Sequence, residues 1–350
     1  MKKQDLKSLT RNELISWFAK EGYPEFRGKQ VFNWIYKNGA QGFDEMTNLP
    51  SNIQEELKEK SFNSDNLILK DVFSASDGTT KYLWSLADCE TIEGVYLPFV
   101  KDGRHSICIS SQVGCAMECT FCATGSDGFV RDLTPGEIVG QVTEIQRSIS
   151  KEEFGEPRIS NVVFMGMGEP LANMDSVLKA INIINDEKGM DIGMRKITIS
   201  TSGIVPKIRK LANIEMQLVL AISLNAPNNF LRDSLMPINK KYPIEELIKA
   251  VKYYIEKTNR RVTFEYVLID ELNDSKDLAY ELAGLLKGLL CHVNLIPLNP
   301  VEQFNFKSPS KKVVNEFRDI LESKGIETTI RQERGKNIEA ACGQLRHLKK

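Results

Sequence analysis

No apolar run in this sequence is long enough to span a bilayer, and the first residues, MKKQDLKSLTRNEL, contain no apolar core of signal-peptide length. We therefore expect a cytoplasmic protein with reduced thiols and no membrane partner. The number of cysteines is odd, seven in 350 residues, which argues against the disulfide framework of small secreted proteins. Nothing in the sequence indicates an oligomer, so we expect a monomer.

A net positive charge is also lacking over the whole chain. The formal net charge is −1, so the molecule as a whole has no field that attracts nucleic acid, and any surface for a polyanion must be local. Residues 331–350 carry an excess of basic side chains and are one candidate for such a surface. Short basic pairs at 195–196, 240–241 and 260–261 are more typical of solvated faces.

The length and a hydrophobic content of 41% predict roughly two domains with a sizeable core. We expect a small helical accessory domain over residues 1–65. Its first helix would follow the apolar stripe from Leu9 to Phe18, with Asp5 or Ser8 as a possible cap. Two more helices are predicted at 27–37 and 51–60. Strand-like runs at 67–69, 82–84 and 95–97 predict an antiparallel β extension over residues 66–100.

From residue 101 to 350, short β-rich runs alternate with longer helical segments, which is typical of βαβ units on a parallel sheet. The expected strands lie at 107–110, 161–165, 196–200, 217–223, 261–269 and 292–296, with 327–330 as a possible seventh. Six units predict an α/β fold, an incomplete (β/α)6 barrel. Polar or glycine-rich segments follow five of these strands. Because loops at the carboxyl ends of parallel strands converge on one mouth, we expect a shared site there.

Three cysteines, Cys115, Cys119 and Cys122, follow the first of these strands with the spacing C-x3-C-x2-C. Three thiolates can hold a 4Fe-4S cluster and leave its fourth iron open to the amino and carboxylate groups of S-adenosylmethionine (SAM). An electron from the cluster then cleaves SAM and releases a 5′-deoxyadenosyl radical. The spacing, with Phe121 before the last cysteine, resembles that of the radical SAM enzymes. A zinc site completed by His105 and Cys108 is the alternative.

Small polar groups at the ends of later strands are candidates for contacts with a cofactor. Gly168 lets the backbone approach a ligand, and the Glu169 carboxylate can accept hydrogen bonds from an ammonium group. Ser200, Ser223 and Asn299 offer hydroxyl or amide groups suited to a ribose or a carboxylate. Each of these short segments alone would be interpreted as an ordinary turn. Their common position at the ends of strands favours a site.

Two cysteines outside the motif also attract interest. Cys342 lies near the carboxyl end among basic residues, which favour a thiolate. Cys108 lies on the strand that leads into the cysteine motif, between apolar neighbours, and we expect it to be buried. Cys89 and Cys291 are interpreted as buried, inert thiols.

Five segments, ICISSQVGCAMECTFCATG, FMGMGEPLAN, ITISTSGI, LIPLNP and IRQERGKNIEAACGQL, together resemble the RlmN family of radical SAM enzymes, which methylate carbon 2 of adenine in ribosomal and transfer RNA. The likeness extends to FRGKQVFNWIYKNG and MTNLP and covers nearly the whole chain. It implies a radical SAM barrel, one 4Fe-4S cluster per chain and two molecules of SAM consumed per turnover. The cluster ligands would be Cys115, Cys119 and Cys122. The implied cofactor contacts are Gly168, Glu169, Ser200, Ser223, Leu224, Asn225 and Asn299.

The resemblance also implies catalytic roles. Cys342 would be methylated by one SAM, and a radical from a second SAM would take a hydrogen atom from that S-methyl group before its carbon adds to adenine. Cys108 would attack Cys342, free the methylated base and leave a transient disulfide. Glu93 would accept a proton. Asn225 departs from the family, which commonly has histidine there, and asparagine cannot carry a positive charge.

The implied substrates are a specific adenosine in the peptidyl-transferase region of 23S rRNA and the adenosine 3′ to the anticodon in a subset of tRNAs. A flavodoxin or ferredoxin would supply electrons. The helical accessory domain and the basic tail would bind the RNA, and the target base would leave its stack. The closest alternative is the Cfr-like branch, which methylates carbon 8 and shares Cys108 and Cys342. A radical enzyme acting on a small molecule or peptide, and a metal-binding module without activity, are further alternatives.

Overall fold

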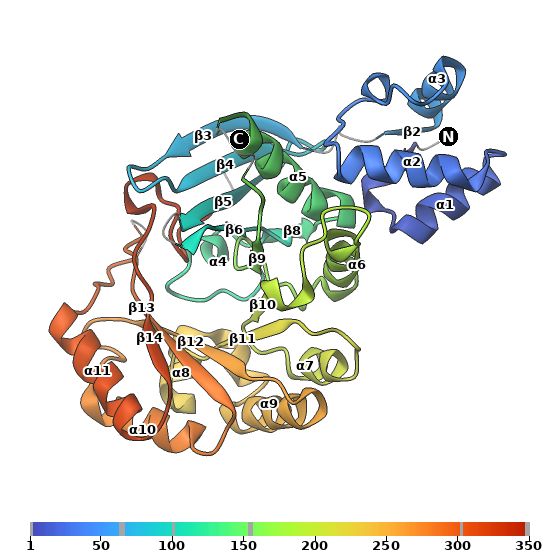
Figure 1. The fold of residues 1–350 in the computed structure, drawn as a ribbon. Helices are drawn as coiled ribbons and strands as arrows, with labels where there is room; N and C mark the ends of the chain where they lie inside the picture. Colours follow the sequence, from blue (N-terminus) through green and yellow to red (C-terminus); the bar gives the residue numbers. More distant parts are fainter. Residues whose placement is uncertain (1–2, 63–66, 100–101, 153–156, 302–303, 347–350) are drawn as a thin grey trace.

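One large sheet organises most of the chain (Figure 1). The computed structural model describes residues 3–62, 67–99, 102–152, 157–301 and 304–346, and its ten-stranded sheet has the order β14-β13-β12-β11-β10-β9-β6-β5-β4-β3. The strands from β6 to β14 in this order pair in parallel, and β3, β4 and β5 extend the sheet with antiparallel pairs. The parallel strands are β6 (Arg104–Cys108), β9 (Asn161–Phe164), β10 (Ile197–Thr201), β11 (Val219–Ser223), β12 (Val262–Leu268), β13 (Cys291–Pro297) and β14 (Thr328–Ile330).

Helices connect the parallel strands and lie on the outside of the sheet (Figure 1). They are α5 (Pro135–Glu152), α6 (Met174–Asn185), α7 (Val205–Ala212), α9 (Ile244–Thr258), α10 (Lys276–Leu286) and α11 (Lys311–Ser323), with the short α4 (Ala123–Ser126) and α8 (Asn229–Leu235) in two of the loops. In α6, Val177, Ile181 and Ile184 recur with helical spacing and are all buried against the sheet. Ser275 and Ser310 cap α10 and α11 by accepting hydrogen bonds from backbone amides.

The predicted incomplete α/β barrel is confirmed. The possible strand at 327–330 is real, because β14 pairs in parallel with β13, so the described chain has seven parallel strands joined by six helical crossovers. The strand predicted at 107–110 instead runs from Arg104 to Cys108. It ends early because the Ser110 N–H donates to Gln141 Oε1 at 2.8 Å, which turns the chain off the sheet and towards α5.

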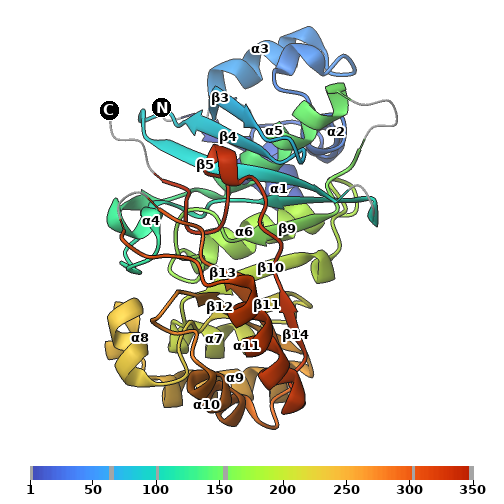
Figure 2. The same ribbon diagram turned by 90° about the vertical axis from the view of Figure 1, so that its left-hand side faces the viewer.

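The N-terminal helices lie at one end of the molecule and α9 to α11 at the other (Figure 2). They are α1 (Arg11–Lys20), α2 (Glu25–Tyr36) and α3 (Ser51–Lys60). The prediction that Asp5 or Ser8 caps the first long helix was wrong. Thr10 caps α1 in a reciprocal capping box with Glu13, whereas Asp5 caps only a single 3-10 turn over Leu6–Ser8. The T-x-x-E spacing that produces this box is present in the sequence.

The N-terminal helices pack against the barrel. Their buried side chains belong to the same apolar cluster as the barrel core. Two ion pairs join α1 to the α6 region: Arg11 Nε lies 2.9 Å from Asp186 Oδ2, and Lys179 Nζ lies 2.8 Å from Glu13 Oε2. The short strand β1 (Gln4–Asp5) pairs with β2 (Ser61–Phe62), which closes this helical region on itself.

The antiparallel extension consists of β3 (Ile68–Ser74), β4 (Thr80–Ser85) and β5 (Thr91–Phe99), which are longer than the runs predicted from the sequence. Strand β3 forms the sheet edge and is exposed along its whole length, whereas β4 and β5 are mostly buried. Strand β5 therefore reaches the side of the barrel. Among the described residues, none of the helices has the length and apolar character required to cross a membrane.

Candidate active site

The cysteine motif occupies a loop at the carboxyl end of β6 that backbone contacts hold in place. The strands β7 (Gln112–Gly114) and β8 (Phe129–Asp132) form a small antiparallel sheet on either side of it. Gly114 has a φ of +70°, and a Cβ there would lie 1.8 Å from the Gly128 carbonyl oxygen, so the turn requires glycine. The Cys115 N–H donates to that same oxygen at 2.9 Å.

A cavity of about 160 Å³, here called the inner cavity, lies at the carboxyl ends of the parallel strands. Three of its lining residues are the motif cysteines Cys115, Cys119 and Cys122. Most of the other candidates also line it: Gly168, Glu169, Ser200, Ser223, Asn225, Asn299 and Cys342. The expectation that the strand-end loops converge on one place therefore holds for these residues.

Burial dominates the electrostatics of the three motif thiols. It raises the pKa of Cys115 to about 12 and also raises those of Cys119 and Cys122, and the thiols further raise one another's pKa values by mutual repulsion. Three buried thiolates need positive charge to compensate them, which the iron of a cluster provides, so this donor set fits a 4Fe-4S cluster. Within the described ranges, no three His, Cys, Asp or Glu side chains are gathered around a single-ion site.

The GMGEP loop supplies a cradle at the inner cavity. Gly168 has a φ of +97°, and a Cβ there would lie 2.5 Å from Gln112 Cβ, so only glycine fits. The Glu169 carboxylate accepts hydrogen bonds from the backbone N–H and the hydroxyl of Ser202, both at 2.7 Å, and from the Leu171 N–H at 3.0 Å. Burial nevertheless raises the pKa of Glu169. A ligand ammonium beside this carboxylate would offset that cost.

The segment after β11 is braced by a buried arginine. Arg232 donates to the carbonyl oxygens of Ser202, Ser223 and Leu224 at 2.6, 3.3 and 3.1 Å. Burial lowers the pKa of its guanidinium to about 10. Leu224 itself is fully buried in the apolar core and is not among the lining residues of the inner cavity.

Asn225 lines the inner cavity in a left-handed conformation with a φ of +59°, which asparagine tolerates better than most residues. Its Oδ1 accepts a hydrogen bond from the Val267 N–H at 2.9 Å. The side chain that replaces the family's usual histidine is therefore tied to β12.

Asn299 lies in the wall between the inner cavity and a second cavity, and carries an unsatisfied atom. Its Nδ2 donates to the Cys342 carbonyl oxygen at 3.3 Å, whereas its buried Oδ1 has no hydrogen-bond partner in the described part of the chain. A buried acceptor without a partner is costly, and a hydroxyl or ammonium of a bound ligand would satisfy it.

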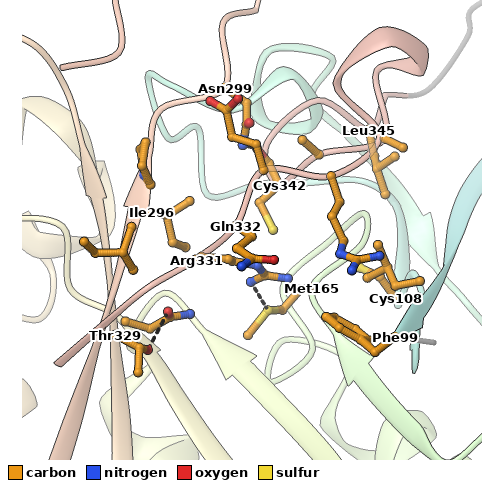
Figure 3. A pocket seen from close by; sticks show the side chains of 18 of the residues that line it. Phe99, Cys108, Met165, Ile296, Asn299, Thr329, Arg331, Gln332, Cys342 and Leu345 are labelled. Atoms are coloured by element: carbon orange, nitrogen blue, oxygen red, sulfur yellow. Dashed lines mark hydrogen bonds between the residues drawn. The ribbon is translucent and has the colours of Figure 1, made fainter. Parts of the chain in front are cut away.

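The second cavity, here called the outer cavity, has a volume of about 590 Å³ and shares the residues Met165, Ile296, Asn299, Arg331 and Cys342 with the inner one. Cys108 lines the outer cavity only and is buried, as predicted. The prediction of burial was wrong for Cys89, which is exposed, and Cys291 is only half-buried. Figure 3 shows the sulfur of Cys342 directed into the outer cavity, towards Arg331 and Met165. Cys342 thus faces both cavities.

Electrostatic contacts connect the two thiols with Arg331. Burial raises the pKa of Cys108 to about 12, and the charge of Cys342 adds to this effect. The negative charge of Cys342, with smaller contributions from Glu265 and Cys108, raises the pKa of the Arg331 guanidinium. Arg331 is therefore a cation whose charge interacts with those of both cysteines.

Glu93 is placed differently from the other candidates. Its Oε1 lies 3.0 Å from Lys81 Nζ in a pair whose side chains are 3% and 7% exposed, and its Oε2 accepts a hydrogen bond from the Arg346 N–H at 3.0 Å. Burial raises the pKa of the Glu93 carboxyl, and Lys81 opposes this shift. In the described structure Glu93 is in the lining of neither cavity, and it contacts the tail that carries Cys342.

Comparison with known proteins identifies the family. A protein named probable dual-specificity RNA methyltransferase RlmN from Alkaliphilus oremlandii is 51% identical over 348 residues, which are 99% of this chain and 98% of that protein. The chain belongs to the RlmN family of radical SAM RNA methyltransferases. A protein of the same name from Clostridium novyi is 48% identical over 343 residues, which are 98% of this chain and 98% of that protein.

Family models and a solved structure agree with this membership in RlmN. The model of the radical SAM superfamily matches residues 109–283, and that of the ribosomal RNA large subunit methyltransferase N-terminal domain matches residues 4–62. The crystal structure of a radical SAM methyltransferase from Sphaerobacter thermophilus, 46% identical, has a TM-score of 0.94 and covers 98% of this chain and 99% of that one. The resemblance to RlmN in the sequence is thereby confirmed, and membership of the superfamily indicates a 4Fe-4S cluster and the use of SAM.

Several residues of this RlmN-family site were missed in the sequence. Four residues that contact the candidates are not recognisable from their neighbours in the sequence: Arg331, Arg232, Ser202 and Lys81. Those neighbours are typical of a basic tail, a helix, a turn and a strand. A buried charge is recognised only when the partner that lies far away in the sequence is known. Arg331 had a usable signal, because it stands directly after the last strand, where the site residues of the other strands also lie.

Proposed function

We propose that this chain methylates carbon 2 of a specific adenosine in the peptidyl-transferase region of 23S rRNA and of the adenosine 3′ to the anticodon in a subset of tRNAs. The observation that carries the proposal is the position of Cys342 in the wall shared by the inner and outer cavities. A thiol in this wall can receive a methyl group from one side and present it to a base on the other.

The inner cavity, together with the part of the outer cavity at the five shared residues, is assigned to the cofactor, because about 160 Å³ alone is below the roughly 300–1,000 Å³ of typical ligand sites. Cys115, Cys119 and Cys122 would hold the 4Fe-4S cluster, which when bound supplies the electron that converts SAM into a 5′-deoxyadenosyl radical. Glu169 and Asn299 would orient SAM, because one offers a buried carboxylate and the other a buried acceptor that lacks a partner. Gly168, Ser200, Ser223 and Asn225 would complete the contacts.

Cys342 is assigned to the methyl group. Its sulfur attacks the methyl carbon of SAM, S-adenosylhomocysteine leaves, and the sulfur becomes a thioether beside the Arg331 guanidinium. The S-methyl group then faces the outer cavity, where its carbon, after losing one hydrogen atom, bonds to carbon 2 of adenine.

Cys108 and Glu93 are assigned to the release of the product. Cys108 attacks the sulfur of Cys342, and the two sulfurs form a transient disulfide. The bond between the Cys342 sulfur and the methylene carbon breaks, and its electron pair with one proton completes the methyl group. The unpaired electron of the adduct returns to the flavodoxin or ferredoxin. Both thiols are free and both line the outer cavity. Glu93 accepts the proton that leaves carbon 2. Because its carboxylate holds the Arg346 N–H, this role requires that the tail first release it.

The test is anaerobic incubation of the reconstituted enzyme with methyl-labelled SAM, a reduced flavodoxin or ferredoxin and protein-free 23S rRNA, followed by mass spectrometry of the nucleosides. We expect labelled 2-methyladenosine and its loss in Cys342→Ala. Cys291→Ala is the matched control, since Cys291 is a partly buried thiol outside the lining of both cavities, and it should retain activity.

Other results would favour the alternatives. Labelled 8-methyladenosine without the 2-methyl product would indicate the Cfr-like reaction. Turnover of SAM that persists with a non-RNA acceptor in Cys342→Ala would indicate a radical enzyme for small molecules or peptides. Tightly bound zinc without iron–sulfur absorption would indicate a metal-binding module.

A further inference from the structure

A cluster of two arginines and one phenylalanine lines the outer cavity and has no part in the chemistry described above. The Cζ atoms of Arg104 and Arg334 lie over the Phe99 ring, 4.7 Å and 4.4 Å from its centroid. Phe99 ends β5, Arg104 begins the next strand, β6, and Arg334 follows β14, so two regions distant in sequence meet here. Figure 3 shows Phe99 at the side of the cavity where Cys108 lies.

The two arginines differ in how firmly they are held. Arg334 Nη1 donates to the Pro98 carbonyl oxygen at 2.7 Å, while its buried Nε has no hydrogen-bond partner within the described residues. Arg104 is 47% exposed, and its Nη2 lies 2.7 Å from Asp102 Oδ2, whose side chain is 55% exposed. An exposed pair of this kind is weak and is screened by salt, so a phosphate can replace the Asp102 carboxylate.

Ring contacts give these arginines a property that isolated lysines lack. A guanidinium is planar, and stacking on an aromatic ring with one face leaves the other face available to a nucleobase. Unstacked bases of RNA are commonly held on aromatic rings and on arginine planes. The outer cavity, at about 590 Å³, lies within the roughly 300–1,000 Å³ of typical ligand sites and therefore has room for a nucleotide.

We propose that Arg104, Phe99 and Arg334 form a stacking wall of the RNA site, on which a base next to the target adenine packs while Arg104 contacts its phosphate. This inference rests on the proposed function and adds to it the residues that hold the substrate beside Cys342. The competing role is structural, because Arg334 also ties the segment after β14 to β5. Arg104 separates the two roles, since it is exposed and ties no backbone segment.

The experiment measures the affinity of the anaerobic holoenzyme for a fluorescein-labelled, protein-free fragment of the 23S rRNA peptidyl-transferase region. Arg104→Gln should raise the Kd about tenfold, as expected for one lost base stack and one lost phosphate contact. Arg104→Lys keeps the charge and should retain the salt dependence of binding. Because it lacks the planar guanidinium, its Kd should rise by most of the same factor. The matched control is Arg209→Gln: Arg209 lies over the Tyr253 ring at 5.8 Å but is outside the lining of both cavities, and this change should leave the Kd within about twofold.

Thermal unfolding of each variant shows that it is folded before its affinity is compared. If Arg104→Lys binds as tightly as the unmodified enzyme, stacking on Arg104 is refuted and charge alone acts there. If Arg104→Gln and Arg209→Gln bind alike, the cluster has no role in RNA binding and is structural. If the unmodified enzyme does not bind the fragment at all, the proposed function fails as well, which distinguishes the two failures.

Discussion

The two cavities that meet at Cys342 are built in different ways. The inner cavity, about 160 Å³, is lined by residues that follow the strands in short contiguous strings such as the cysteine motif and GMGEP. The outer cavity, about 590 Å³, is assembled from two regions that are far apart in the sequence, one with β5 and β6 and the other with β13, β14 and the tail. The first is fixed by local backbone bonds, and the second depends on contacts that hold distant segments together.

Under the proposed function, the radical chemistry takes place in the inner cavity and the RNA is recognised in the outer one. A small cavity lined by the three motif thiols and a buried carboxylate suits a cluster and the positive groups of a cofactor. A larger cavity with arginine, asparagine and threonine side chains suits a polyanion that must enter and leave. The five shared residues, and above all Cys342 and Arg331, are the place where the two functions meet.

The largest effect is expected at the support of the outer cavity. Lys81→Met removes the partner of buried Glu93, which also holds the Arg346 N–H of the tail. Breaking a buried ion pair from one side typically costs about 3–5 kcal/mol, because the remaining charge has no compensation. We expect a loss of this size in the free energy of unfolding, measured with urea under anaerobic conditions on the loaded enzyme.

Two further variants test this explanation. Lys249→Met breaks the exposed pair with Glu246, which has a similar distance of 2.8 Å, and should cost less than about 1 kcal/mol. Lys81→Met combined with Glu93→Leu removes both charges and should recover most of the stability. Equal losses for Lys81→Met and Lys249→Met would mean that the buried pair does not support the tail.

An intermediate effect is expected at the residue that both cavities share. Arg331→Gln removes the cation whose charge interacts with that of Cys342, and an electrostatic interaction of about 1.5–3 kcal/mol corresponds to roughly 10- to 100-fold. We expect the methylation of Cys342 by labelled SAM, measured without RNA by peptide mass spectrometry, to slow by this factor. Arg331→Lys should restore part of the rate because it restores the charge.

Because this assay contains no RNA, it shows whether Arg331 acts on Cys342 itself or only on RNA in the outer cavity. If Arg331→Gln methylates Cys342 at the normal rate and is impaired only in RNA binding, Arg331 belongs to the outer cavity alone. A loss in both assays would support its place in the shared wall.

The same contrast explains what the sequence could predict. The candidates of the inner cavity are recognisable because each belongs to a short string that ends a strand, and parallel strands end at one edge. Two such features are recognisable in the local sequence: the spacing of Cys115, Cys119 and Cys122, and the glycine at position 168. The seventh strand was also recognisable from its β-branched run.

The outer cavity could not be predicted in this way. Phe99, Arg104 and Arg334 have ordinary neighbours, and their meeting depends on how β5, β6 and the segment after β14 come together. Glu93 was recognised by resemblance, yet its pairing with Lys81 is visible only when β4 and β5 are in register. Thr10 and Glu13 are the opposite case, because their capping box was readable in the sequence and was overlooked.

The smallest effect is expected from a change of one pH unit, at a thiol that lines only the outer cavity. Burial raises the pKa of Cys108 to about 12, so at neutral pH almost all of this thiol is protonated, and its attack on Cys342 requires the thiolate. Below that pKa the thiolate fraction grows about tenfold per pH unit, so the release of methylated RNA from its covalent adduct with Cys342 should accelerate by the same factor. Starting a single-turnover measurement from the isolated adduct removes the earlier, inner-cavity steps from the observed rate. Cys108→Ala should retain the adduct at every pH, and a flat profile for the unmodified enzyme would mean that the thiol is ionised in the adduct and that burial does not limit release.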